Sequence, residues 1–83
     1  MKQKVIKLES RYKDVDSKLV QVENNKYLLE TNSEYVRLSR AENRTIYSID
    51  LEGGPMISIG DTIQGKKVKS IKGQYVIEFE WFV

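Results

Sequence analysis

The break Glu52-Gly53-Gly54-Pro55 restricts the fold of this chain more than any other segment. Paired glycines adopt positive φ values at little steric cost, and Pro55 can begin a strand that needs no ladder hydrogen bond at that position. Residues 45–51, before the break, alternate in the way of a half-buried strand, with Thr45, Tyr47, Ile49 and Leu51 sharing one face. Residues 56–59 follow as a short apolar run. The pattern predicts two strands joined across this turn.

Residues 1–38 support two interpretations. Apolar residues spaced by three and four are typical of a coiled-coil helix: Val5, Leu8, Tyr12, Val15, Leu19 and Val22. A hairpin competes, because residues 19–23 and 27–31 read as short strands on either side of Asn24-Asn25, which tolerate left-handed turn conformations. The segment has no alanine and many residues that are unfavourable within a helix, so we favour strands.

The remaining chain continues in short alternating runs separated by Gly-rich turns. We therefore expect one all-β domain over residues 1–83, a small antiparallel barrel or sandwich of about six to eight short strands. The alternative is an N-terminal coiled-coil helix followed by a β domain. No helical pattern lies between strands, which argues against a parallel βαβ arrangement.

The composition limits the chemistry that this chain can perform. Its 83 residues include no Cys and no His, which excludes disulfides, thiolate zinc sites and the commonest general base. We expect no enzyme activity, no metal and no cofactor. A core this small favours support from a homo-oligomer. The absence of Cys, of a signal peptide and of a long apolar run favours a cytoplasmic location.

The segment 35–47 contains five residues of the types that form binding surfaces: Tyr35, Arg37, Arg40, Arg44 and Tyr47. Tyrosines on a sheet can stack bases while neighbouring arginines hold phosphates. The competing interpretation places the tyrosines at the edge of the core and the arginines on a solvated loop, and we favour it because aromatic residues commonly fill β cores.

The glycine turn and its neighbours offer weaker candidates. Gly53 and Gly54 could expose backbone N–H groups to an anion, although a plain strand connection explains them more simply. Asp50, Glu52 and Asp61 flank the turn, where turn chemistry is a simpler role than holding a metal. A basic cluster, Lys66, Lys67, Lys69 and Lys72, suits a weak anion contact or a solvated face. With a net charge of +2 and no basic stripe, the chain is unlike a dedicated duplex-DNA binder.

The last residues form an apolar run that we expect to be an interface with another copy. In the closing run, residues 75, 77, 79 and 81 share one alternating face. An exposed terminal strand of this composition would aggregate, so it is either core or a subunit contact. The expected interface residues are Phe79, Trp81, Phe82 and Val83.

Residues 45–79 resemble segments of small uncharacterised proteins of bacteriophages and mobile elements, in which an acidic residue, a Gly-Gly-Pro turn and a Gly-Asp pair precede a basic strand. The resemblance implies a non-enzymatic protein that binds a host protein or sequesters a nucleotide-like anionic ligand, with a possible role against host defence. If the chain is phage-encoded, the expected location is the cytoplasm of the host. The alternatives are a small barrel that binds single-stranded nucleic acid, and a structural subunit of a virion or other assembly.

Overall fold

The computed structural model describes residues 3–80 of the chain, and within them every regular element is a strand except for one short 3₁₀ turn. The elements are β1 (Val5–Leu8), β2 (Ser17–Glu23), β3 (Lys26–Thr31), β4 (Val36–Arg40), β5 (Ile46–Leu51), β6 (Met56–Ser58), β7 (Thr62–Ile63), β8 (Lys66–Lys72), η1 (Gly73–Tyr75) and β9 (Val76–Phe79). The all-β prediction is confirmed, and the coiled-coil alternative is wrong because β1, β2 and β3 occupy the segment. Only the two-residue strand β7 has no alternating or apolar run in the sequence that predicts a strand.

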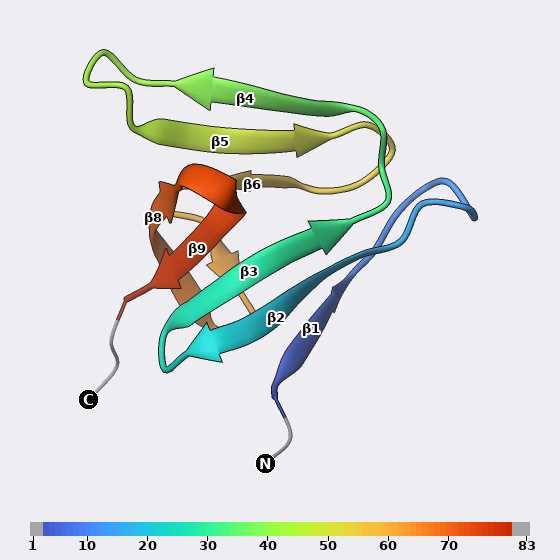
Figure 1. Ribbon diagram of the computed structural model, residues 1–83, viewed down its shortest axis with the longest axis horizontal. Helices are drawn as coiled ribbons and strands as arrows, with labels where there is room; N and C mark the ends of the chain where they lie inside the picture. Colours follow the sequence, from blue (N-terminus) through green and yellow to red (C-terminus); the bar gives the residue numbers. More distant parts are fainter. Residues whose placement is uncertain (1–2, 81–83) are drawn as a thin grey trace.

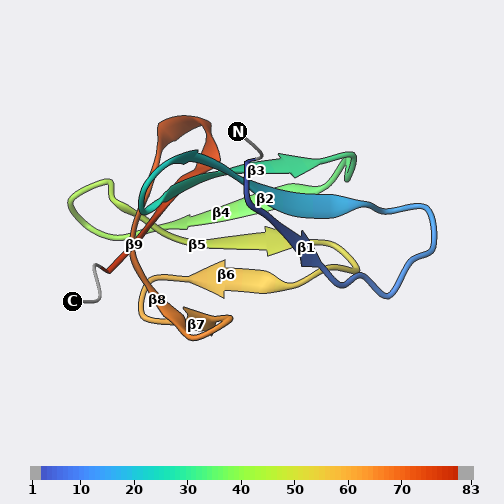
Figure 2. The ribbon, with the colours of Figure 1, turned by 90° about the horizontal axis from the view of Figure 1, so that it is seen from below.

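The strands form two antiparallel sheets. Six strands pair in the order β1-β2-β3-β9-β8-β7, and three pair in the order β4-β5-β6. Figure 1 shows the three-stranded sheet lying across one end of the curled six-stranded sheet, and Figure 2 shows the same arrangement from below. This arrangement places the β4–β5 turn beside the end of β8, although about thirty residues separate them in the sequence.

The core fills the space between the sheets with side chains from alternate strand positions. Leu19, Tyr27 and Ile77 come from the six-stranded sheet, and Ile49 and Ile57 come from the three-stranded sheet; all are almost fully buried. This alternation follows from the pleat, which sends successive side chains to opposite faces. The sequence signal for strands and the burial pattern therefore agree over most of the chain.

Phe79 belongs to this core. Its side chain is buried, and its ring meets the ring of Tyr27 edge to face, with centroids 5.3 Å apart. The expectation that Phe79 lies at an oligomer interface is therefore wrong: β9 pairs with both β3 and β8, so its alternate side chains point into the core. Trp81, Phe82 and Val83, which were expected to share that interface, lie outside the described residues.

A bulge in β5 changes which residues face the core. Ser39 pairs with Ser48 and Arg40 with Ile46, so Tyr47 is an extra residue without a partner on β4. A bulge of this kind shifts the alternation by one residue. Ile46 and Ile49 are both buried as a result, while the side chain of Tyr47 is 53% exposed. The prediction that Tyr47 shares a face with Ile49 and Leu51 is therefore wrong.

No helix within residues 3–80 has the length and apolar character needed to cross a membrane.

Candidate anion-binding groove

A basic groove lies where the β4–β5 turn meets the end of β8. Its volume is about 390 Å³, and it is lined by Arg40, Arg44, Thr45, Ile46, Ser70, Ile71, Lys72 and Gly73. Ile46 and Ile71 also line it, but both are buried and expose little surface to it. The polar residues around them supply two guanidinium groups, one ammonium group and two hydroxyl groups. We call this site the basic groove.

The β4–β5 turn fixes the two arginines of the basic groove. The N–H of Ala41 donates to the carbonyl of Thr45, and the N–H of Arg44 donates to the carbonyl of Ala41, both at 2.9 Å. The side-chain oxygen of Asn43 accepts from the N–H of Thr45 at 3.1 Å. These three bonds close the turn locally, so both arginines are presented from a defined backbone.

Arg44 occupies an unusual backbone conformation for its residue type. Its φ is +65°, in the left-handed region that glycine and asparagine favour at this position of a hairpin turn. An ordinary residue there costs about 1–2 kcal/mol relative to a right-handed conformation. Strained residues tend to occur at functional sites, so an arginine in place of glycine marks this turn as a candidate.

The charges of the basic groove are not neutralised by close carboxylates. None of its lining residues is acidic. In the described part of the chain, the ion pairs are Lys18–Glu30 and Lys26–Glu23, so Arg40, Arg44 and Lys72 have no carboxylate there within ion-pair distance. Arg40 donates a long hydrogen bond of 3.5 Å to the carbonyl of Arg44, which uses one of its five N–H donors.

One acidic residue approaches the rim of the basic groove through a lining hydroxyl. Ser70 donates to a carboxylate oxygen of Glu78 at 3.2 Å. A bound anion would therefore be repelled at the Ser70 side and attracted to the side of Arg40, Arg44 and Lys72. The geometry favours an anion held by the three cations, with the hydroxyl of Thr45 within the same lining.

The proposed aromatic platform is not formed. From the β4–β5 register, Tyr35 lies beyond the Val36–Leu51 pair at one end of the hairpin, while Tyr47 lies at the other end, roughly 13 Å away along the strands. Both rings are exposed, Tyr35 by 37% and Tyr47 by 53%, so the interpretation that they fill the core edge is also wrong.

Arg37 is grouped with Tyr35 and separated from the other arginines. Its guanidinium carbon lies 5.7 Å from the Tyr35 ring centroid, and its strand position pairs with Asp50. Tyr35 lines a hollow shared with Glu34, Glu52 and other residues, so its surroundings are acidic. Of the five residues proposed as a binding surface, the structure brings only Arg40 and Arg44 together in the basic groove.

Gly53 is a docking point for the β1–β2 loop. Its carbonyl accepts from the N–H of Arg11 and from the hydroxyl of Ser10, and the ring of Tyr12 covers its Cα. The N–H of Gly54 donates to the carbonyl of Leu51 at 2.7 Å within the turn. Figures 1 and 2 both show this loop beside the β5–β6 turn. The structure therefore supports a strand connection here, because Gly53 is buried and an anion cannot approach it as expected for a nest.

The other candidates have local roles or lie apart. Asp61 accepts from the N–H of Ser58 at 2.8 Å, which is turn chemistry, and residues 3–80 contain no cluster of three potential metal-ligating side chains. Within the lysine cluster, Lys66 donates to the hydroxyl of Tyr27 at 3.0 Å, and only Lys72 lines the basic groove. Sequence reasoning missed Thr45 and Ser70, for which the local pattern gave no signal.

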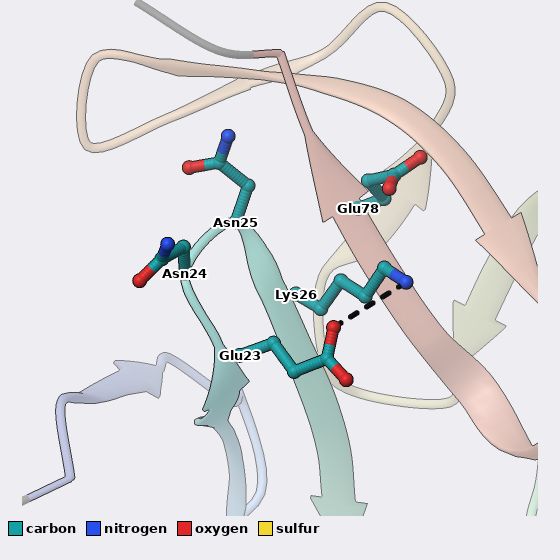
Figure 3. A pocket seen from close by; sticks show the side chains of 5 residues that line it. All are labelled: Glu23, Asn24, Asn25, Lys26 and Glu78. Carbon is teal, nitrogen blue, oxygen red and sulfur yellow. Dashed lines mark ion pairs between the residues drawn. The ribbon is translucent and has the colours of Figure 1, made fainter.

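A second hollow lies at the β2–β3 turn and has a different character. It is lined by Glu23, Asn24, Asn25, Lys26 and Glu78. Figure 3 shows Lys26 directed at Glu23, with 3.5 Å between the ammonium nitrogen and a carboxylate oxygen. The single cation of this hollow is thus already paired, and its two carboxylates make it unsuitable for an anion.

Comparison of this chain with family models, with curated proteins and with solved structures finds no match.

Proposed function

We propose that this protein is a non-enzymatic binding domain that holds a small phosphate-bearing ligand, of nucleotide size, in the basic groove. The observation that carries the proposal is the convergence of Arg40, Arg44 and Lys72 on one hollow whose lining contains no carboxylate. Arginine suits phosphate because its planar group donates two parallel hydrogen bonds to adjacent oxygens. A protein of this kind would act by sequestering its ligand, as the resemblance to phage proteins implies.

The size of the basic groove supports a ligand larger than a single phosphate. Its volume of about 390 Å³ falls within the range of small-molecule sites. The three cations would hold the phosphates, and the hydroxyl of Thr45 in the same lining can bond a further oxygen of the ligand. The same groove could receive one nucleotide of a single strand, so the source of the phosphate has to be distinguished by experiment.

The test is thermal unfolding of the full chain at low salt with inorganic phosphate, pyrophosphate, ATP and a short single-stranded oligonucleotide. A ligand at ten times its Kd stabilises the folded state by about 1.4 kcal/mol, which raises the Tm of a domain this size by about 6–11 °C. A rise in Tm with ATP supports a free nucleotide as the ligand, provided that the oligonucleotide, at the same concentration of nucleotides, raises the Tm by no more than ATP does. Stabilisation by the oligonucleotide alone, falling steeply with salt, indicates nucleic acid instead.

Two substitutions test the location of the ligand. Arg44→Gly removes one cation while giving the turn the residue that its backbone favours, and Lys72→Gln removes another from a different element. The matched control is Lys67→Gln, which removes the same charge at an exposed position outside the groove. We expect each groove variant to weaken ATP binding roughly tenfold and the control to leave it unchanged. No stabilisation of the parent protein by any of these ligands would refute the proposal.

A further inference from the structure

The outer face of β1, β2, β3 and β9 carries a continuous apolar row. In the strand register, Val5 pairs with Val20, Val20 with Leu28, and Leu28 with Val76. The residues next to them along each strand are buried on the inner face, so these four point outward. Val5 is 54% exposed, and the other three are half-buried. A face of an antiparallel sheet that contacts only water usually carries polar residues, so an apolar row across four strands marks this face as a candidate contact surface.

Charged residues of β2 and β3 lie on both sides of the row, and the strand that carries the positive charge on one side carries the negative charge on the other. On one side, Lys18 of β2 pairs with Glu30 of β3, with 3.9 Å between their charged atoms. On the other side, Glu23 of β2 pairs with Lys26 of β3, as Figure 3 shows. On β2 and on β3, therefore, the sign of the charge on one flank is opposite to the sign on the other. The outer strands add Lys7 of β1, which pairs with Lys18, and Glu78 of β9, which pairs with Lys26.

The two flanks are equally distant from the apolar row. On β3, Lys26 and Glu30 each lie two residues from Leu28. On β2, Lys18 lies two residues from Val20, and the bulge at Val22 brings Glu23 into the matching position opposite Lys26. Each flank is thus about 7 Å from the row. Without the bulge, Glu23 would point to the inner face, and the symmetry of the pattern would be lost.

We propose that this face binds a second copy of the same chain, with a two-fold axis that runs along the apolar row. Rotation about that axis exchanges the flanks and keeps each strand over its counterpart, so Lys18 faces Glu23 of the second copy and Glu30 faces Lys26 of the second copy. The apolar rows meet in between, and because the sheet curls around the core (Figure 1), the contact is centred on β2 and β3, the strands that carry the four paired charges.

Among the strand residues, one flank holds Lys7, Lys18 and Glu30, and the other holds Glu23, Lys26 and Glu78. One flank therefore has an excess of one positive charge and the other an excess of one negative charge, and the rotation places them opposite each other. The face as a whole is neutral, so it complements its own copy better than a strongly acidic or basic partner. The face adjoins the basic groove, because Lys72 of the groove pairs with Val76 of the row, but the dimer is argued from the apolar row and its flanks alone.

The dimensions of the face predict a weak dimer. Four strands by about five residues make a patch of roughly 19 Å by 15 Å per copy, smaller than the roughly 800 Å² per partner of a standard stable interface. We therefore expect a monomer at low micromolar concentration and a dimer that becomes populated at concentrations on the order of 0.1–1 mM. Sedimentation velocity of the full chain over this range measures the dissociation constant.

Leu28→Lys tests the apolar row. A charge at the centre of the row should raise the dissociation constant by at least roughly tenfold, whereas the outward direction of the side chain leaves the core intact. Circular dichroism and Tm confirm that the variant folds. Dimerisation that persists unchanged in folded Leu28→Lys would overturn the proposal.

Charge exchange tests the two-fold arrangement even if Leu28→Lys fails to fold. Glu23→Lys places like charges opposite each other between copies and should weaken the dimer roughly tenfold. Adding Lys18→Glu to Glu23→Lys restores an attractive pair between residue 18 of one copy and residue 23 of the other. Within each copy, both ion pairs of the parent protein stay broken in this double variant. Recovery of dimer affinity is therefore predicted only by the proposed arrangement. Glu42→Lys changes the net charge equally on the β4–β5 turn and is the control. A monomer at 1 mM, an equal effect of the control, or no recovery in the double variant would each overturn the proposal.

Discussion

Replacing Gly53 by alanine tests whether the β1–β2 loop is anchored to the β5–β6 turn by a steric fit. A Cβ at this position would lie 2.1 Å from Cδ2 and 2.3 Å from Cε2 of the Tyr12 ring, so the ring would have to leave. Tyr12 is 47% exposed, which means that about half of its surface is covered. Re-exposing roughly 100 Å² of it costs about 2.5 kcal/mol.

The backbone adds a second and smaller cost. Gly53 has a φ of +77°, where alanine is less stable by about 1 kcal/mol, and the gain from a stiffer unfolded chain offsets most of that amount. The expected loss for Gly53→Ala is therefore about 2–3 kcal/mol, a fall in Tm of about 10–20 °C for a domain of this size. The control is Gly65→Ala, because Gly65 has a φ of +79° and open space where its Cβ would lie.

A double-mutant cycle with Tyr12→Ala separates the two costs. In the Tyr12→Ala protein the ring is absent, so Gly53→Ala should cost less than about 1 kcal/mol, similar to Gly65→Ala in the parent protein. The free energies of unfolding come from urea titrations of the four proteins, and the coupling energy should be about 2 kcal/mol. If Gly53→Ala costs the same with and without Tyr12, the steric reasoning is wrong.

Three further predictions concern the turns and the basic groove. Arg44→Gly should be more stable than Arg44→Ala by about 0.5–1 kcal/mol, because only glycine relieves the positive φ; equal urea midpoints would contradict this. Glu78→Gln should strengthen ATP binding severalfold in the thermal-shift assay by removing the one carboxylate bonded to a groove residue, and unchanged or weaker binding would count against the proposed anion position. Asn32→Ala should speed trypsin cleavage after Lys13, because the Asn32 amide bonds the N–H of Asp16 at 2.6 Å and the carbonyl of Asp14 at 2.8 Å. Asn24→Ala, at an exposed turn position, is the control, and equal cleavage of both variants would show that the Asn32 bonds do not hold the loop.

The β2–β3 hairpin shows which structural features can be predicted from the preferences of a few neighbouring residues. Short β-branched runs on either side of Asn24-Asn25 predicted it, and the structure pairs the two strands across that turn. Strand and turn preferences act over a few residues, since they arise from sterics and the pleat, so they can be read without knowing the partner strand. The same reasoning located the break at Gly53 but could not show that Tyr12 covers it.

The candidate site was predictable in part. Arg40 and Arg44 could be singled out because they lie close together in the sequence beside a turn. Lys72 belonged to a separate basic cluster, and nothing local distinguished it from Lys67 or Lys69. Its place in the basic groove depends on how β8 packs beside the β4–β5 turn, which is a property of the whole fold.

By itself, the sequence determined that this chain forms short antiparallel strands, because its alternating apolar residues and closely spaced turn residues exclude long helices. Only the tertiary structure decided which side chains face water. The bulge at Tyr47 turned a predicted inward-facing ring outward, and pairing of β9 on both edges buried Phe79. Bulges and strand order result from contacts between segments distant in the chain, so a periodic pattern that repeats every two residues cannot reveal them.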